Sequence, residues 1–227
     1  MLVARHKKGC SAATRLLLEN ERKEWKWGNV PPSYKTYLQD GMVGVKEDEF
    51  MNSFSIVRNT VLAPSMQWTS TQILLRTIWT RIKESHSRRG NVNVRCLNCG
   101  MEPERTKHLF YSCRLVRESK DKLELAIKGG RSQETKLTEN MVLFHVYESD
   151  ASATERRDID DLLIIFKHVL WRLRFRENTE RFPTARQVIV TLIIELENLM
   201  KCRDKVGEGN FGILEMVLTL KREINWI

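Results

Sequence analysis

Residues 96–113 contain three of the five cysteines of the chain together with one histidine. The stretch reads Cys96-Leu97-Asn98-Cys99-Gly100-Met101-Glu102-Pro103-Glu104-Arg105-Thr106-Lys107-His108-Leu109-Phe110-Tyr111-Ser112-Cys113. Its spacing is C-x2-C-x8-H-x4-C. Two cysteines separated by two residues can turn both sulfur atoms to one side of a tight loop. Gly100, directly after the pair, permits the positive φ that such a loop often needs. We therefore predict that the three cysteines and the histidine converge on one point.

The chemistry of these four side chains favours zinc. Three thiolates and one neutral imidazole form a closed tetrahedral shell, which is typical of structural zinc sites. Soft sulfur ligands select against magnesium and calcium, and we expect backbone N–H groups of the loop to point at the thiolates. The alternative is a set of reduced core cysteines with an unrelated histidine, but the residues around them are polar. The predicted ligands of a structural Zn2+ ion are Cys96, Cys99, His108 and Cys113.

The rest of the composition indicates a soluble intracellular protein. An odd number of cysteines without a readable secretory signal argues against a disulfide framework, and we expect the isolated Cys10 and Cys202 to be packing residues. The most apolar stretch, residues 161–173, is interrupted by charged residues and is shorter than the ~20 residues of a membrane-spanning helix. We expect a nuclear or cytoplasmic protein without membrane contact.

The positive charge is concentrated in the middle of the chain. Residues 69–131 hold 14 basic and 6 acidic residues, a net charge of +8 against +9 for the whole chain. A clustered positive field attracts polyanions, so we predict that the protein binds RNA or DNA through phosphate contacts. The alternative is a basic surface that only keeps the protein soluble. The predicted phosphate-binding residues, which lie nearest the cysteine loop in sequence, are Arg88, Arg89, Arg95, Arg105, Lys107, Arg114 and Arg117.

Three apolar or aromatic residues lie between the last two predicted ligands. We expect Leu109 and Phe110 to form a small core beneath the metal site, because so short a module has little else to bury. Tyr111 has two possible roles. It packs in the same core, or it presents its ring to an unpaired base, as aromatic side chains do in single-strand binding proteins.

Apolar periodicity predicts a mainly α-helical protein, with amphipathic helices flanking one small zinc-knuckle loop and an antiparallel helical hairpin near the C-terminus. The predicted helices are residues 11–27, 71–85, 114–128, 155–178, 184–203 and 213–224. Ser70 is the predicted N-cap of the second helix, and Pro183 is predicted to open the fifth. Residues 34–65 are predicted to be loops with short elements, because Gly41, Gly44 and Pro64 interrupt them.

We divide the chain into three parts. Residues 1–68 form an N-terminal segment without an assigned role, residues 69–131 the basic zinc-binding module, and residues 132–227 a C-terminal helical region. On the helix predicted for residues 155–178, His168, Arg172 and Arg176 are predicted to form a basic stripe that is either a solvated face or a phosphate contact.

The motif Cys96-x2-Cys99-Gly100, followed by His108-Leu109-Phe110-x2-Cys113 and a charged helix, resembles a known family. It is similar to the zinc-binding region C-terminal to the reverse transcriptase of non-LTR (LINE-type) retrotransposons, and the resemblance covers residues 69–200. The resemblance implies a zinc-bound module that helps to hold template RNA or target DNA during target-primed reverse transcription. The chain is too short to include the polymerase domain, so we expect a detached, non-catalytic tail.

We expect no enzymatic activity. The string Asp158-Ile159-Asp160-Asp161 lacks the preceding aromatic residue of a polymerase metal site, and the apolar residues after it indicate the acidic first turn of a helix. The restriction-like nuclease of some LINE-type tails carries a Pro-Asp dipeptide, which does not occur in this sequence. The alternative function is a protein-interaction module, in which the zinc is purely structural and the C-terminal helices bind a partner or a second copy. A residual retroelement nuclease is a third alternative.

Overall fold

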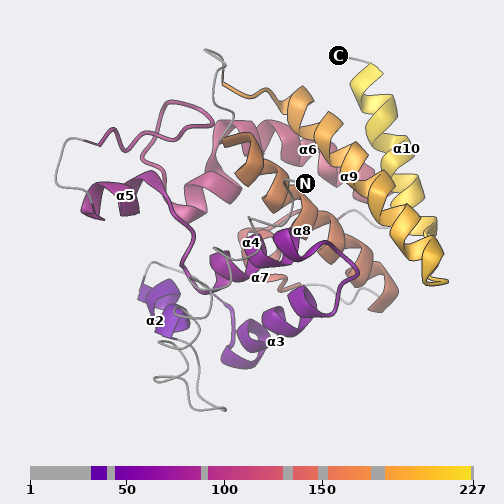
Figure 1. Cartoon of the computed structure of the whole chain (residues 1–227), viewed down its shortest axis with the longest axis horizontal. Helices are drawn as coiled ribbons and strands as arrows, with labels where there is room; N and C mark the ends of the chain where they lie inside the picture. Colours follow the sequence, from indigo (N-terminus) through magenta and orange to yellow (C-terminus); the bar gives the residue numbers. More distant parts are fainter. Residues whose placement is uncertain are drawn as a thin grey trace, which may run out of the picture.

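The structure is a computed structural model that describes residues 32–39, 44–87, 92–129, 135–147, 153–174 and 182–225. Regular structure in these ranges is helical, apart from one antiparallel bridge between Arg95 and Pro103 (Figure 1). The elements are α2 (Pro32–Gln39), α3 (Glu47–Arg58), α4 (Pro64–Leu74), α5 (Arg81–Ser87), the π-helix η1 (His108–Ser112), α6 (Arg114–Gly129), α7 (Glu139–Phe144), α8 (Ala153–Arg174), α9 (Ala185–Lys205) and α10 (Phe211–Asn225). The prediction of a mainly α-helical protein is confirmed. None of the helices in the described ranges is both long and apolar enough to cross a membrane.

Helix α8 is the centre of the fold. It is buried without interruption from Asp158 to Leu170, and a helix buried on all sides has to be surrounded by other elements. Helices α4 and α9 make its largest contacts, and α3, α10 and η1 also pack against it (Figure 1). The apolar residues that recur with a helical period along this helix are all buried: Ile159, Leu162, Leu163, Phe166, Leu170 and Leu173.

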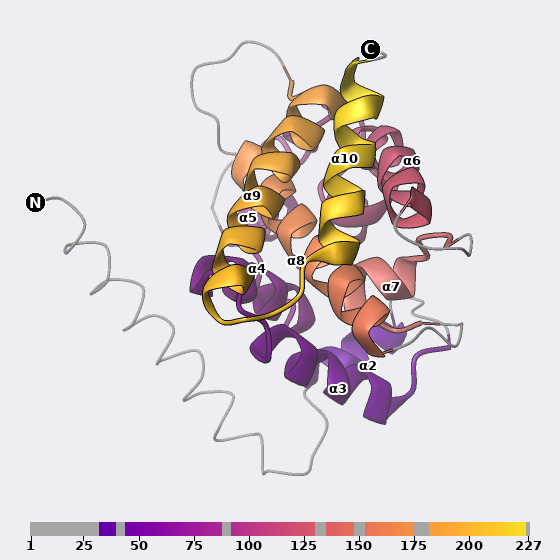
Figure 2. The same cartoon turned by 90° about the vertical axis from the view of Figure 1, so that its right-hand side faces the viewer.

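Helices α8, α9 and α10 run antiparallel to one another in chain order (Figure 2). Arg203, near the end of α9, pairs with Asp158 and Asp161 near the start of α8. Lys221, near the end of α10, pairs with Glu197 of α9 at 2.7 Å. The predicted C-terminal hairpin is therefore confirmed, and α10 adds a third antiparallel helix.

Two helices begin where the sequence predicts. Helix α9 follows Pro183 and is capped by Thr184, whose hydroxyl accepts the N–H of Gln187 at 3.2 Å, while the Gln187 side chain accepts the N–H of Thr184 at 2.9 Å. This reciprocal capping stabilises the first turn. Helix α6 begins directly after Cys113 and buries the predicted face, which includes Leu123 and Ile127.

The prediction of loops over residues 34–65 is wrong, because the 12-residue helix α3 lies inside this stretch. Its first turn contains three acidic residues, which the helix dipole favours. The side chain of Glu49 also accepts the N–H of Lys46 at 2.8 Å. Gly44, with a φ of 79°, precedes the helix and Pro64 follows it, so neither residue interrupts it. The predicted helix over residues 11–27 lies outside the described residues.

The single helix predicted for residues 71–85 is instead two helices, α4 and α5. Pro64 takes the first position of α4, where its missing N–H costs nothing, so the predicted N-cap, Ser70, is buried inside the helix. Helix α4 ends at Leu74, shortly before Arg76, which has a φ of 54°. The N–H groups of the next two residues return to the carbonyl of Gln72 at 2.8 and 3.2 Å, which closes the helix end.

All three predicted parts of the chain contribute to one hydrophobic core. Its fully buried members include Phe50 from the N-terminal part, Leu123 from the basic module and Leu163 from the C-terminal region. The segment of residues 96–113, which carries the four predicted metal ligands and is called the metal loop below, is therefore attached to a helical body that contains residues from the whole described chain.

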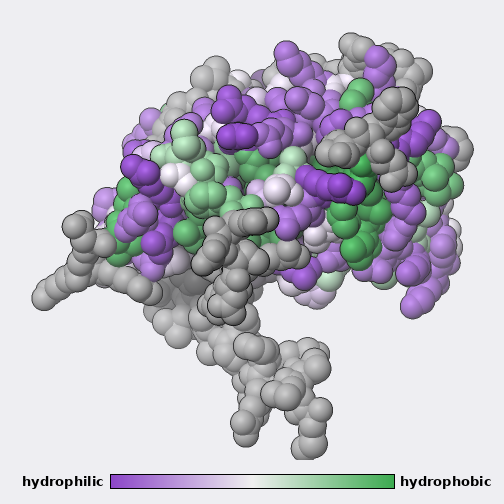
Figure 3. Space-filling view, turned by 90° about the horizontal axis from the view of Figure 1, so that it is seen from above, coloured by the Kyte–Doolittle hydropathy of each residue, from purple (hydrophilic) through white to green (hydrophobic). Residues whose placement is uncertain are grey.

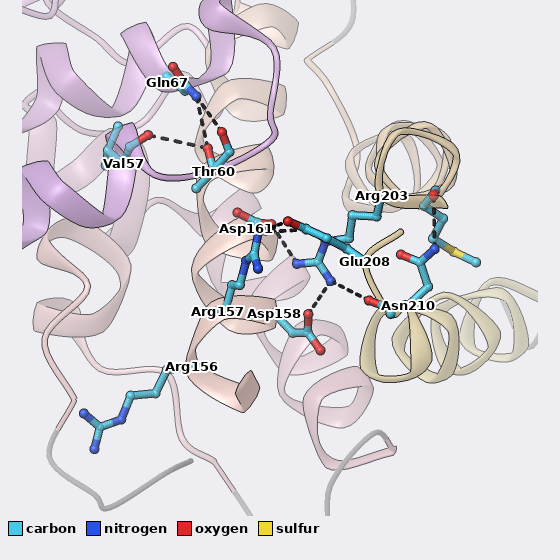
Figure 4. A network of polar contacts seen from close by, with 12 residues as sticks. Val57, Thr60, Gln67, Arg156, Arg157, Asp158, Asp161, Arg203, Glu208 and Asn210 are labelled. Carbon is cyan, nitrogen blue, oxygen red and sulfur yellow. Dashed lines mark hydrogen bonds and ion pairs between the residues drawn. The ribbon is translucent and has the colours of Figure 1, made fainter. Parts of the chain in front are cut away.

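The acidic string of α8 is not the first turn of the helix, which begins earlier, at Ala153. Its carboxylates form buried ion pairs instead. Arg203 donates to Asp158 at 2.6 Å and to Asp161 at 2.8 Å (Figure 4). Burial raises the pKa of Asp161 to about 6, against the opposing effect of the Arg203 guanidinium. The string therefore has a structural role, joining the start of α8 to the end of α9.

A second buried polar cluster lies further along α8. His145, which ends α7 with a φ of 57°, has its Nδ1 2.8 Å from Asp160 Oδ1. Its Nε2 lies 2.8 Å from Nζ of Lys167, whose side chain is completely buried. The hydroxyl of Tyr147 donates to Asp160 at 2.5 Å. Burial lowers the pKa of Lys167 to about 7, although the Asp160 carboxylate acts in the opposite direction.

The close approach of Gly212 in α10 to Asp158 predicts that one methyl group added at Gly212 lowers the stability of the protein. A Cβ at Gly212 would collide with a carboxylate oxygen of Asp158, so Gly212→Ala should lower the free energy of unfolding by about 1–3 kcal/mol. A Cβ at Gly209 meets nothing within 4 Å, so Gly209→Ala is the matched control and should leave stability nearly unchanged. Equal urea midpoints for the two variants would contradict this arrangement.

The Lys167 cluster predicts a specific pH dependence. The pKa of Lys167 falls from 10.5 to about 7 on folding, so between these values the unfolded chain binds about one more proton than the native protein. The free energy of unfolding should then decrease as the pH falls, by about 1.4 kcal/mol per unit. In Lys167→Met this contribution disappears, whereas the exposed Lys205→Met keeps the wild-type slope. Urea titrations between pH 7.5 and 9.5 measure the difference, and parallel slopes for wild type and Lys167→Met would refute it.

Candidate metal centre

A short hairpin carries the first two predicted ligands. The N–H of Cys96 donates to the carbonyl of Glu102, and the N–H of Glu104 to that of Val94, both at 2.8 Å. At the tip, the N–H of Gly100 donates to the carbonyl of Cys96 at 2.8 Å, and Gly100 has a φ of 69°. The predicted positive φ is confirmed, and it is what allows the chain to reverse between the two arms.

The other two predicted ligands lie at the ends of the π-helix η1. The N–H of Cys113 donates to the carbonyl of His108 at 2.8 Å, a bond between residues five apart. This wider turn brings residues five apart close to the same side of the helix, and such turns occur frequently at functional sites. Leu109 and Phe110, between the two, are fully buried, so the predicted core beneath the site is confirmed.

The four side chains converge as the sequence predicts. One ligand atom from each of Cys96, Cys99, His108 and Cys113 lies within 4.8 Å of all the others. Sγ of Cys99 is 3.3 Å from Nε2 of His108. Three of the four residues are buried and Cys99 is partly exposed. This group can hold a metal ion with four ligands.

The groups of the cluster change one another's pKa values. The pKa of Cys96 is lowered to about 5, first by a hydrogen bond from Cys113 and also by His108 and the backbone N–H of Asn98, which lies 3.4 Å from the sulfur. The hydrogen bond that His108 makes to Cys96 raises the pKa of His108 to about 9. The thiol of Cys113 also donates a hydrogen bond to Cys96, and this raises the pKa of Cys113. One thiolate thus opposes ionisation of the next. A divalent cation at the centre would make three thiolates compatible, which is the chemistry expected of this donor set.

Glu102 lies on the outer side of the histidine. Its Oε2 is 3.2 Å from Nδ1 of His108. The two groups are close but not hydrogen-bonded, because Nδ1 of His108 is buried without a hydrogen-bond partner. Here the nitrogen that faces the sulfur atoms is Nε2.

Glu104 attaches the metal loop to the helical body. Its carboxylate is completely buried and accepts the backbone N–H of Leu97 at 3.1 Å and that of Arg81 at 2.9 Å. Arg174, at the end of α8, donates to the same carboxylate through Nε at 2.9 Å and lies 2.6 Å away through Nη2. No local sequence pattern indicates this pair, because 70 residues separate its members.

The structure describes five of the seven predicted phosphate-binding residues, and all five are exposed; Arg88 and Arg89 lie outside the described residues. Lys107 pairs with Glu139, and Arg114 with Glu118, each at 2.7 Å. Among the described residues no ion pair is seen for Arg95, Arg105 or Arg117. Exposed ion pairs contribute little energy, so all five side chains are accessible to an anion.

Packing bears on two further expectations. Tyr111 is partly buried against the core, and its ring centroid lies 5.3 Å from Nζ of Lys120, which favours the packing role over the stacking role. The basic stripe predicted on α8 is wrong for His168, which is buried and hydrogen-bonded to Thr69 at 3.0 Å because α4 covers this face. Arg172 is exposed and pairs with Glu195, whereas Arg176 lies outside the described residues.

The convergence of the four ligands predicts the result of removing one sulfur. Cys99→Ser should lower the bound metal from one ion per chain and reduce thermal stability, because ligand binding energy in small metal modules is folding energy. Cys202 is exposed on α9, so the expectation that it is a packing residue is wrong, whereas Cys10 lies outside the described residues. Cys202→Ser should therefore change neither property. Elemental analysis and thermal melts measure both. One metal ion per chain in Cys99→Ser would refute the ligand assignment.

No family model, curated protein or solved structure matches this chain. The comparisons therefore neither support nor oppose the resemblance to the zinc-binding region of retrotransposon reverse transcriptases. What the structure adds is the convergence of the four residues that carry the motif.

Proposed function

We propose that this protein is a non-catalytic module that binds a structural zinc ion and contacts RNA or DNA phosphates, as the resemblance to the retrotransposon tail implies. The observation that carries the proposal is the convergence of Cys96, Cys99, His108 and Cys113 in a loop that lies in the most basic part of the chain.

Zinc is the metal that fits this donor set best. Three sulfur ligands are soft and exclude hard cations such as magnesium and calcium. Four protein ligands close a tetrahedral shell and leave no position for a reacting water, which is typical of a structural ion. The ion would hold the hairpin of residues 94–104 against η1.

Phosphate binding is supported by the exposed cations near this loop. Arg95 lies on the first arm of the hairpin, Arg105 directly follows its second arm, and Arg117 lies in the first turn of α6 after the last ligand. A metal site that fixes the backbone around these residues would hold their charges in constant positions. Such contacts give affinity for any nucleic-acid sequence, because phosphates carry no base information.

The rival function, a protein-interaction module, is favoured by a different surface. Val190 and Ile194 of α9 are exposed, as are Leu214 and Leu218 of α10, and each pair is spaced one helical turn apart. A concentration-dependent dimer in size-exclusion chromatography, without retention of nucleic acid, would support this rival.

Salt dependence tests the phosphate contacts. For duplex DNA, log affinity against log salt concentration should fall with a slope of about 0.9 per neutralised phosphate. Arg105→Ala and Arg117→Ala should each weaken binding and reduce that slope by about 0.9 if each residue contacts one phosphate. Lys205→Ala removes the same charge at the end of α9 and serves as the control. Affinity that does not change with salt would contradict the proposed function.

A further inference from the structure

Exposed apolar side chains gather at the metal loop. Leu97 is 37% exposed and Met101 71%, and both belong to the turn that contains Gly100. Phe182, which precedes α9, is 57% exposed. The space-filling view from above shows hydrophobic patches between hydrophilic side chains (Figure 3). Single exposed apolar residues are ordinary, but a group of them beside a metal-bound turn indicates a contact surface.

Phe182 is held against the loop by the tip of its ring. A Cβ on Gly100 would lie 2.6 Å from Cζ of Phe182, and 3.1 and 3.4 Å from the two Cε atoms. The ring therefore approaches the glycine backbone, and the missing side chain of Gly100 makes the room for it. This contact involves the tip of the ring, and the Phe182 side chain as a whole remains 57% exposed. An aromatic ring presented in this way can stack on a base.

Two exposed arginines flank this turn in the sequence, Arg95 before it and Arg105 after it. Gly100 is hydrogen-bonded to Cys96, the neighbour of Arg95. Arg105 follows Glu104, whose carboxylate accepts the N–H of Leu97. Both arginines are exposed, and no ion pair is seen for either within the described chain. The exposed acid of the loop, Glu102, lies toward His108.

We propose that Phe182, whose ring tip lies against Gly100, is a stacking platform for an unpaired base, and that this surface binds single-stranded nucleic acid. Arg95 and Arg105 contact the phosphates of the strand. A duplex fits less well, because neighbouring bases already cover the faces of every base inside it. The inference deepens the proposed nucleic-acid-binding function and rests on it.

The test compares two nucleic acids on the same protein. The 227-residue chain purified with zinc is titrated into a fluorescein-labelled oligothymidylate strand and, separately, into its duplex with oligoadenylate, at one salt concentration. Phe182→Leu keeps an apolar side chain but loses the ring, and it should weaken single-strand binding by about fivefold or more, with the duplex affinity unchanged. Phe182→Trp keeps a ring and should keep the affinity. Ile194→Ala, an exposed apolar position on α9, is the control.

The possible outcomes distinguish a failure of the stacking platform from a failure of the proposed nucleic-acid-binding function. If Phe182→Leu binds the single strand like wild type while Arg105→Ala binds weakly, the stacking platform is wrong and the nucleic-acid function stands. An equal loss for strand and duplex, or a preference of wild type for the duplex, also overturns the platform. Metal content equal to wild type excludes misfolding of the variant as the cause. If wild type binds neither nucleic acid and forms a dimer that Phe182→Leu abolishes, the surface binds protein and both proposals fail.

Discussion

The Glu104 carboxylate is buried in the protein, where two backbone N–H groups and the Arg174 guanidinium meet it. Burying a charge alone is costly, and here the partner charge and two further donors compensate for the lost water. These donors come from the metal loop itself, from the start of α5 and from the end of α8. The Glu104 side chain therefore fixes the position of the metal loop relative to α5 and α8. Removing Arg174 would leave the buried Glu104 carboxylate without its cation, and the loss of one partner of a buried ion pair typically costs about 3–5 kcal/mol.

Helix α8 has buried ion pairs near both of its ends. Arg174, at the C-terminal end of α8, pairs with Glu104 of the metal loop, while Asp158 and Asp161, near its N-terminal end, pair with Arg203 of α9. Between them, Asp160 and Lys167 are satisfied by His145. Buried ion pairs give little net stability compared with apolar residues, but each has a definite partner. Because α8 is buried on nearly all sides, these specific pairs determine which neighbouring element packs against which turn of the helix.

The candidate centre combines a rigid interior with an exposed rim. Inside, three sulfur atoms and an imidazole nitrogen face one another. Outside, the same turn presents Met101, Arg95 and Arg105 to solvent, and Gly100 receives the ring of Phe182. A metal ion that fixes the interior would fix the rim as well, because only a few backbone bonds separate them. Binding chemistry at the rim would then depend on the ion without any direct contact to it.

The sequence by itself determined the convergence of Cys96, Cys99, His108 and Cys113, because these residues lie within 18 positions and Gly100 permits the turn between the two arms of the hairpin. It also determined α6, α8 and α9, whose apolar periods are long and regular. It misplaced the helices of residues 34–85, where Pro64 and Gly44 were interpreted as interruptions although one begins a helix and the other precedes one. Only the tertiary structure decided the partners of Glu104, the acidic string of α8, Lys167 and Phe182. These contacts join residues far apart in the chain, and no local pattern in a single sequence records which distant side chain will compensate a buried charge or fill the space above a glycine.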